Sequence, residues 1–286
     1  MNAEGLVSGK LSRHQAFTNA QLCLSMFEDM GRPIARESRI LDFGCGEGWM
    51  VYAFRKLGYN AFGTDIEPPS SQVKELLCQE ALAERGAAVL IDKDASDQRI
   101  PFSSDYFDVV VSWDVMEHVH DHVRTLTEIK RVLKPGGESL HYFPARYRPI
   151  ESHTSVPFGT IIRFQAYLYF WALVGFKNAD DKALPAHQVA TKNYEFLKHH
   201  TNYLTRRQIR RLAERCFGNV EFVEEHACRY DPKGQGRVQR LLCRLSSGMA
   251  KPLATSLLSA CGRRAVFFVK PGNGNEGLSG CPAGAI

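Results

Sequence analysis

The stretch that decides the fold is "RILDFGCGEGWM", from Arg39 to Met50. Its apolar run contains an acid, Asp42, and glycines follow at positions 44, 46 and 48. This GxGxG spacing differs from the GxGxxG of a dinucleotide-binding loop, and the GK[ST] of a phosphate-binding loop is absent. A carboxylate before the first glycine would repel a pyrophosphate and attract a cation. Taken alone, the glycine spacing is also compatible with a structural strand-to-helix turn that binds no ligand.

A second acid follows in "AFGTDIE", where Asp65 ends the next apolar run. A carboxylate at the end of a second strand can accept hydrogen bonds from both hydroxyls of a ribose. Ile66 comes next and offers an apolar surface to a purine. The two acids together therefore indicate a nucleoside that carries positive charge and no phosphate. S-adenosylmethionine fits this description.

The first half of the chain alternates short apolar runs with amphipathic segments. Strands are predicted at 40–43, 60–64, 89–91, 108–113 and 138–143, and helices at 12–30, 48–57, 70–85 and 121–133. Such alternation predicts a parallel sheet with helices on both faces and ligands beyond the carboxyl ends of the strands. We expect a Rossmann-like, doubly wound α/β fold with a mostly parallel seven-stranded sheet, whose core spans residues 1–144.

The regular alternation of predicted strands and helices ends after Phe143. Residues 145–204 are rich in aromatic residues and contain an apolar helix predicted at 161–176. This indicates a cap inserted on the side of the sheet where a second substrate, the acceptor, would bind. The core returns over 205–270, where Thr205 and Gln208 have the spacing of a capping box and strands are predicted at 220–223 and 265–269. The glycine-rich tail, 271–286, is expected to be disordered.

A basic stretch, 231–264, lies between the last two predicted strands. Leucines recur in it at helical intervals beside seven lysines and arginines and the single acid Asp231. Such a segment either packs on the sheet with its charges in water or lies on an anionic membrane surface. The second alternative would make peripheral membrane contact and a lipid-linked substrate part of the function.

Four segments, taken together, resemble the class I S-adenosylmethionine-dependent methyltransferases, in particular the small-molecule, type 11-like members. The first two are "ILDFGCGEGWM" and "GTDIE". They are followed by "DASDQRIPFSSDYFDVVVSWDVMEHV" and "EIKRVLKPGG", in the order and spacing of that family. The resemblance covers roughly residues 12–143 and implies S-adenosyl-L-methionine as the cofactor.

The resemblance also implies a role for each matching residue. The glycine loop lines the methionine end, Asp65 binds the ribose, Ile66 packs on the adenine, and the remaining residues flank the adenine or close over the methionine. The implied cofactor-binding residues are Asp42, Gly44, Cys45, Gly46, Gly48, Asp65, Ile66, Asp94, Ala95, Trp113 and Asp114. Three of them have plainer alternatives: Cys45 as a small packing residue, Asp94 as a solvated loop acid and Trp113 as a core aromatic.

Methyl transfer to an alcohol needs a base, and histidine is the usual choice. The two candidates are His118, just beyond the fourth strand, and His153, just beyond the fifth. Arg146, Tyr147 and Arg148 precede His153 and indicate an acceptor that carries a carboxylate or phosphate. The alternatives are that His118 only holds its loop by a hydrogen bond and that the arginines face solvent.

No metal site is predicted. His118 and His122 have helical i, i+4 spacing, but Asp121 has the position of a helix cap, so the pair spans a loop–helix junction. His199 and His200 have no partner in the sequence and are expected at the surface.

Composition limits the remaining choices. The net charge is +5 and the eight cysteines show no CxxC pair, which is typical of reduced thiols in a cytoplasmic protein. We see no signal peptide, and the longest apolar run, 166–176, is about half as long as a membrane span. Nucleic acid is not expected as a substrate, because "SWDVMEH" stands where many nitrogen methyltransferases carry an Asn/Asp-Pro-Pro-aromatic motif.

These features together predict a methyltransferase that acts on a small or lipid-linked metabolite, at oxygen. The alternative is a protein of the same fold that binds the cofactor or an anionic surface without catalysis. The oligomeric state is not indicated by the sequence.

Overall fold

The computed structural model describes residues 12–66, 70–79, 90–92, 99–230 and 262–272. They form a seven-stranded sheet in the order β3-β2-β1-β4-β5-β7-β6. The strands are β1 (Arg39–Phe43), β2 (Asn60–Asp65), β3 (Leu90–Asp92), β4 (Phe107–Trp113), β5 (Leu133–Pro144), β6 (Glu221–Phe222) and β7 (Arg263–Val269). The first five strands are parallel, and β7 runs antiparallel to both of its neighbours. The expected fold class and strand number are confirmed.

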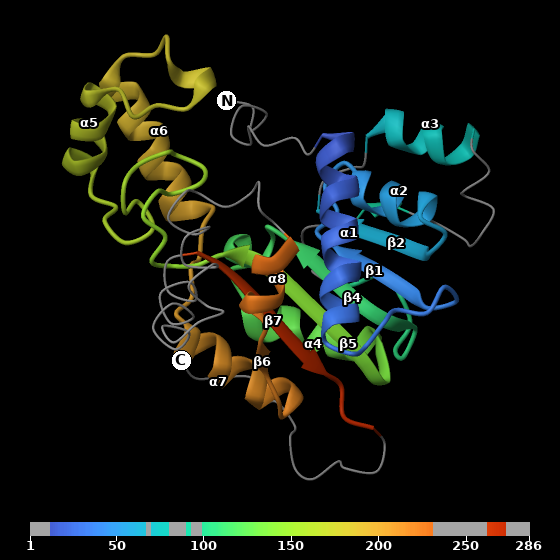
Figure 1. The fold of residues 1–286 in the computed structure, drawn as a ribbon. Helices are drawn as coiled ribbons and strands as arrows, with labels where there is room; N and C mark the ends of the chain where they lie inside the picture. Colours follow the sequence, from blue (N-terminus) through green and yellow to red (C-terminus); the bar gives the residue numbers. More distant parts are fainter. Residues whose placement is uncertain (1–11, 67–69, 80–89, 93–98, 231–261, 273–286) are drawn as a thin grey trace.

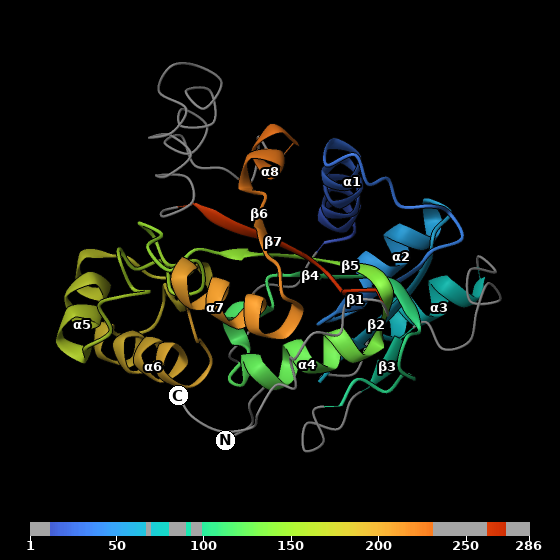
Figure 2. The same cartoon turned by 90° about the horizontal axis from the view of Figure 1, so that it is seen from below.

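Helices cover both faces of the sheet (Figures 1 and 2). One apolar core lies under α1 (Arg13–Asp29), α2 (Trp49–Lys56), α3 (Ser71–Gln79) and α8 (Glu224–Tyr230). A second core lies under α4 (His122–Val132) and α7 (Arg206–Phe217). The inner strands are buried on both faces, which explains their continuous apolar runs.

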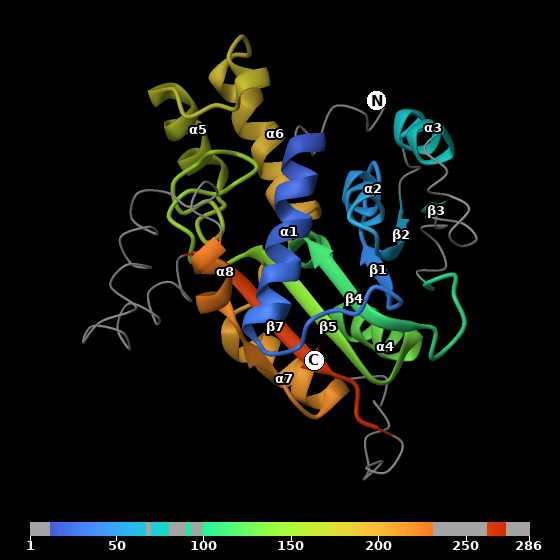
Figure 3. The ribbon, with the colours of Figure 1, turned by 45° about the vertical axis from the view of Figure 1, so that its right-hand side comes forward.

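The segment predicted as a cap stands beyond the carboxyl ends of the strands, on the side toward which the arrow of β4 points in Figure 3. It contains α5 (Gln165–Val174), the short helix η4 (Ala179–Asp181) and α6 (Ala186–His199). A small apolar core joins α5 and α6, made of Val156, Leu168, Ala190, Phe196 and Leu197. The short helix η3 (Met116–His118) follows β4 and faces this cap. The division of the chain into core, cap, return and tail stays a prediction.

The structure corrects two expected elements and adds one that was not expected. The helix predicted at 161–176 begins only at Gln165, because Phe164 has extended backbone, and it ends where Gly175 takes a φ of +99°. The strand predicted at 220–223 is only the two-residue β6, since α8 begins at Glu224. The helix α6 was not predicted from the sequence.

The basic stretch 231–264 is only partly within the described residues. Residues 231–261 and the tail 273–286 lie outside them. The expectation of a helix with solvated arginines is wrong for the two described arginines, Arg263 and Arg264, which form the start of β7. The side chain of Arg264 is 2% exposed, and its guanidinium lies 2.8 Å from Glu224. Among the described residues, no helix is long and apolar enough to cross a bilayer.

Candidate functional site

The glycine loop turns from β1 into α2 through left-handed backbone. Gly44, Gly46 and Gly48 have φ angles of +76°, +51° and +88°, a region that other residues enter only with strain. A Cβ on Gly44 would also lie 2.6 Å from Cγ1 of Val115, whereas a Cβ on Gly46 would meet nothing within 4 Å. The loop thus needs glycine at position 44 for space as well as for backbone angle, and its open side is at Gly46.

The two predicted acids flank this loop. Asp65 accepts a hydrogen bond of 2.7 Å from the backbone N–H of Gly46, and the N–H of Gly44 donates to the carbonyl of Thr64 at 2.8 Å. Because β1 and β2 pair in parallel, both acids lie at the carboxyl-terminal edge of the sheet. The strand order changes direction between β1 and β4, directly beside them. Ligands of open α/β sheets bind at this kind of position.

Asp42 is the most perturbed acid of the loop. It is 2% exposed, and within the described residues its Oδ2 has no hydrogen-bond partner. Burial, with a further contribution from Asp65, raises the pKa of its carboxyl to about 8. A cation beside it would favour the ionised form and supply the missing partner.

Three further predicted cofactor residues lie around the same edge. Ile66 directly follows β2 and is 65% exposed, as a surface for a purine requires. Trp113 is half-buried at the end of β4, with its ring 4.4 Å from that of Tyr142, so it also packs on the core. Cys45 faces β2, because a Cβ on Gly63 would lie 2.7 Å from its Sγ. The need for glycine at position 63 was not predicted from the sequence.

Asp114 directly follows β4, has a φ of +55° and forms an ion pair with Arg263 of β7. The same guanidinium lies over the ring of Tyr142, 4.3 Å from its centroid. Arg263 was assigned to the basic stretch from the sequence, so its place beside the site was missed. Asp94 and Ala95 lie outside the described residues.

A polar cavity of about 280 Å³ opens between the end of β4, the loop after β5 and the cap. Both predicted histidines line it, and so does Arg263. Its remaining lining residues are Asp114, Glu117, Ser152, Thr154, Asn178, Asp180, Asp181, Lys192, Asn193 and Phe196. The predicted substrate-binding residues Arg146, Tyr147 and Arg148 do not line it.

His153 is held by a buried carboxylate. Its Nδ1 lies 2.9 Å from Oε1 of Glu151, which also accepts a hydrogen bond of 2.7 Å from the hydroxyl of Tyr203. Burial alone would raise the pKa of Glu151, but the hydrogen bonds from His153, Tyr203 and Thr154 outweigh it and lower the pKa to about 2. Glu151 is therefore an anion that keeps the proton of His153 on Nδ1 and leaves Nε2 free.

His118 lies against His153, with ring centroids 4.9 Å apart. Its Nδ1 is 2.6 Å from the carbonyl oxygen of His200, which can only accept, so this nitrogen carries the proton. Burial lowers the pKa of His118 and favours the neutral ring. The sequence led us to expect a local hydrogen bond that holds the loop, but the bond is made to His200, 82 residues away. Nε2 of His118 still faces Glu117 at 3.9 Å.

The helical pair His118 and His122 does not form a shared site. Nε2 of His122 lies 2.9 Å from the carbonyl oxygen of Met116, and its Nδ1 faces the side chain of Asn202. As predicted, Asp121 caps α4 by accepting from the N–H of Arg124 at 2.9 Å.

The arginines after β5 point in different directions. Arg146 donates to the carbonyl oxygen of Tyr203 at 2.9 Å, and Tyr147 is 44% exposed. Arg148 is half-buried, and burial and the neighbouring Arg263 lower the pKa of its guanidinium. Their role in binding an acceptor stays a prediction.

A family model described as "Methyltransferase domain" matches residues 13–216, which is more than half of the chain. The chain belongs to this methyltransferase family. The match confirms the resemblance drawn from the four sequence segments, and it spans β1 to β5, the glycine loop, the cap and α7.

Curated relatives agree with this family. A ubiquinone biosynthesis O-methyltransferase of Cereibacter sphaeroides is 30% identical over 122 residues, which are 42% of this chain and 47% of the relative. A methyltransferase of Mycolicibacterium vanbaalenii is 30% identical over 134 residues, covering 46% and 50% of the two chains. The chain thus spans about half the length of the curated relatives it matches.

Among solved structures, the chain is similar to a phosphoethanolamine N-methyltransferase of Haemonchus contortus in complex with S-adenosyl-L-methionine. The TM-score is 0.47 at 18% identity, and the match covers 94% of this chain and 59% of that one.

Proposed function

We propose that the chain binds S-adenosyl-L-methionine at the glycine loop and transfers its methyl group to an oxygen of a small acceptor. The observation that carries this proposal is the state of Asp42, a buried acid without a partner on Oδ2, next to a loop whose open side lacks any phosphate-binding lysine. The sulfonium and ammonium charges of the cofactor supply the cation that such an acid needs. Membership of the methyltransferase family supports the same cofactor.

The acceptor is proposed to enter the polar cavity lined by the two histidines. A volume of about 280 Å³ suits a small metabolite, and the lining offers Lys192 and Arg263 to an anionic group. Relatives named as O-methyltransferases support oxygen as the methylated atom.

A lipid-linked acceptor is supported by the surface of the cap. The helix α5 exposes large apolar side chains, among them Phe170, Leu173 and Val174, which are 55%, 60% and 56% exposed. Such a surface can lie against the acyl region of a bilayer. Co-sedimentation with vesicles of anionic lipid tests this point. A protein that stays in the supernatant would exclude a membrane-bound acceptor and favour an acceptor that is free in solution.

The proposed chemistry is an in-line displacement. The acceptor hydroxyl gives its proton to Nε2 of His153, whose Nδ1–H is held by Glu151. The oxygen then attacks the methyl carbon, and the carbon–sulfur bond breaks with its electron pair staying on sulfur. Because the sulfonium is a good leaving group, the protein mainly positions the two reactants and stabilises charge, and it forms no covalent bond to them.

The test uses S-adenosylmethionine with a labelled methyl group and a metabolite extract, followed by mass spectrometry. We expect a labelled product, a turnover reduced roughly 10²-fold or more in His153→Ala, and an unchanged cofactor affinity. The exposed His187→Ala on α6 is the matched control. Cofactor binding without any labelled product would favour the alternative, a non-catalytic binding protein, and equal turnover in His153→Ala would remove this residue from the mechanism.

A further inference from the structure

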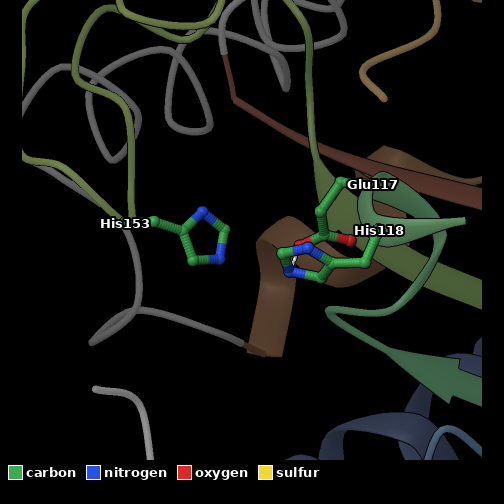
Figure 4. Close-up of side chains that lie close together, drawn as sticks. All are labelled: Glu117, His118 and His153. Carbon is green, nitrogen blue, oxygen red and sulfur yellow. Dashed lines mark ion pairs between the residues drawn. The ribbon is translucent and has the colours of Figure 1, made fainter. Parts of the chain in front are cut away.

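Three of the side chains that line the polar cavity come from two segments of the chain and lie close together. Figure 4 shows the ring of His153 on one side, facing Glu117 and His118 on the other. One donor atom of each residue lies within 4.8 Å of the donor atoms of the other two. Glu117 and His118 come from η3, and His153 comes from the loop after β5. Both histidines were candidates from the sequence, but their convergence with Glu117 was not predicted, because positions 118 and 153 are 35 residues apart.

Glu117 is the unexplained member of the group. Its side chain is 0% exposed, and within the described residues neither carboxylate oxygen has a hydrogen-bond partner. The nearby guanidinium of Arg263 is paired with Asp114 instead. A buried carboxylate without hydrogen bonds is costly, so such groups are normally paired or bound to a metal.

Both histidines are already oriented as metal ligands are. The carbonyl of His200 fixes the proton on Nδ1 of His118, and the carboxylate of Glu151 fixes it on Nδ1 of His153. Each ring therefore keeps the lone pair of Nε2 on the side of the cavity. In metal sites, a ligating histidine almost always donates its other N–H to a carboxylate or backbone carbonyl in this manner.

We propose that Glu117, His118 and His153 bind one divalent cation of the zinc type. Two imidazoles and one carboxylate suit Zn²⁺, whereas Mg²⁺ prefers oxygen ligands. Ligands at about 2.1 Å from one ion are at most about 4.2 Å apart. The 3.9 Å between Glu117 and His118 already meets this limit, and the remaining distances, which are within 4.8 Å, exceed it by at most about 0.6 Å. Three protein ligands beside a cavity leave a position open for a further ligand.

The site rests on these three side chains and does not require the proposed methyl transfer. If the transfer takes place, the ion offers a second way to activate the acceptor. An ion held by these three residues would lower the pKa of an acceptor hydroxyl at the open position, so that the proton would leave to solvent and the oxygen would attack the methyl carbon. The carbon–sulfur electron pair stays on sulfur as before. In the metal-loaded protein, His153 then holds the ion and does not take the proton.

Calorimetric titration of the chelator-treated full chain with Zn²⁺, and separately with Mg²⁺, tests the proposal. We expect one Zn²⁺ site in the wild type, whose affinity is lowered at least about 10-fold in His153→Ala and in Glu117→Gln. His187→Ala should bind as the wild type does, and Mg²⁺ should bind more weakly than Zn²⁺. Zn²⁺ binding of equal stoichiometry and affinity in wild type and His153→Ala would overturn the site, and so would absence of binding to the wild type.

A second measurement does not depend on the folding of any variant. Co²⁺ replaces Zn²⁺ and reports its ligands by absorption, since cysteine ligation adds an intense sulfur-to-metal band in the near ultraviolet. We expect visible bands of Co²⁺ with nitrogen and oxygen ligands and no sulfur band. A dominant sulfur band would place the ion at cysteines and contradict the proposal. Because both readouts are independent of turnover, a failed methyltransferase assay leaves the metal result standing, and the reverse also holds.

Discussion

Replacing Gly44 by alanine perturbs the loop at its tightest point. Gly44 and Gly46 both have positive φ angles, +76° and +51°, so alanine at either position carries backbone strain of roughly 1–2 kcal/mol. At Gly44 the new methyl group also meets Val115, with 2.6 Å to Cγ1, and overpacking of this kind costs about 1–3 kcal/mol. Gly46→Ala meets nothing within 4 Å and is the matched control.

Urea unfolding of the cofactor-free protein measures the difference. We expect Gly44→Ala to lower the free energy of unfolding by roughly 2–5 kcal/mol and Gly46→Ala by only roughly 1–2 kcal/mol. Trimming Val115 to alanine removes both Cγ contacts and leaves only its Cβ, 3.1 Å from the new methyl carbon, so the double variant Gly44→Ala/Val115→Ala should recover most of the difference. Equal stability of the two glycine variants would contradict a steric role for Val115, and so would a difference in unfolding free energy that Val115→Ala does not reduce.

Three further predictions concern charges. Because the pKa of Asp42 is about 8, its carboxyl must lose a proton to pair with the cationic cofactor below that pH. The affinity for S-adenosylmethionine should therefore rise with pH, by up to about tenfold per unit, and level off above pH 8. Calorimetry should show this slope in the wild type and a flat profile in Asp42→Asn. Arg264→Met leaves Glu224 buried without its partner and should cost roughly 3–5 kcal/mol in a urea titration, most of which Arg264→Met/Glu224→Leu recovers; a double variant no more stable than the single one would contradict this. Glu151→Gln removes the anion that orients His153 and should reduce turnover by about tenfold at unchanged cofactor affinity; unchanged turnover would show that the orientation is not needed.

The sequence was sufficient for the part of the fold that rests on local patterns. Buried parallel strands appear as continuous apolar runs, such as Phe107–Trp113, and the glycine loop with its two acids defines one edge of the sheet. Helix starts were predicted where a side chain caps the helix, as at Ser12, Asp121 and Thr205.

The features that were missed depend on partners far away in the sequence. Arg263 and Arg264 were interpreted as solvated because their partners, Asp114 and Glu224, lie 149 and 40 residues earlier. Nothing local shows that a charged pair can begin a buried strand. The helix α6 was overlooked although Val189, Phe196 and Leu197 share its buried face.

In the candidate site, too, the residues named from local patterns were predicted, and the contacts between distant segments were not. Both histidines were named from their positions after strands, since parallel strands end at one edge of the sheet. Their contact with each other and with Glu117 depends on how the loop after β5 returns over η3, which the sequence does not encode in any short pattern. The role of Gly63 likewise depends on the packing of Cys45 across two strands.

Asp42 and Asp65 are proposed to bind a nucleoside that carries positive charge, S-adenosylmethionine, between them. Calorimetric titration of the full chain with S-adenosylmethionine tests this binding most directly. We predict binding of one molecule per chain, at least about tenfold weaker in Asp65→Ala because the ribose loses its acceptor. Absence of binding at millimolar cofactor, or equal affinity in Asp65→Ala, would contradict the account.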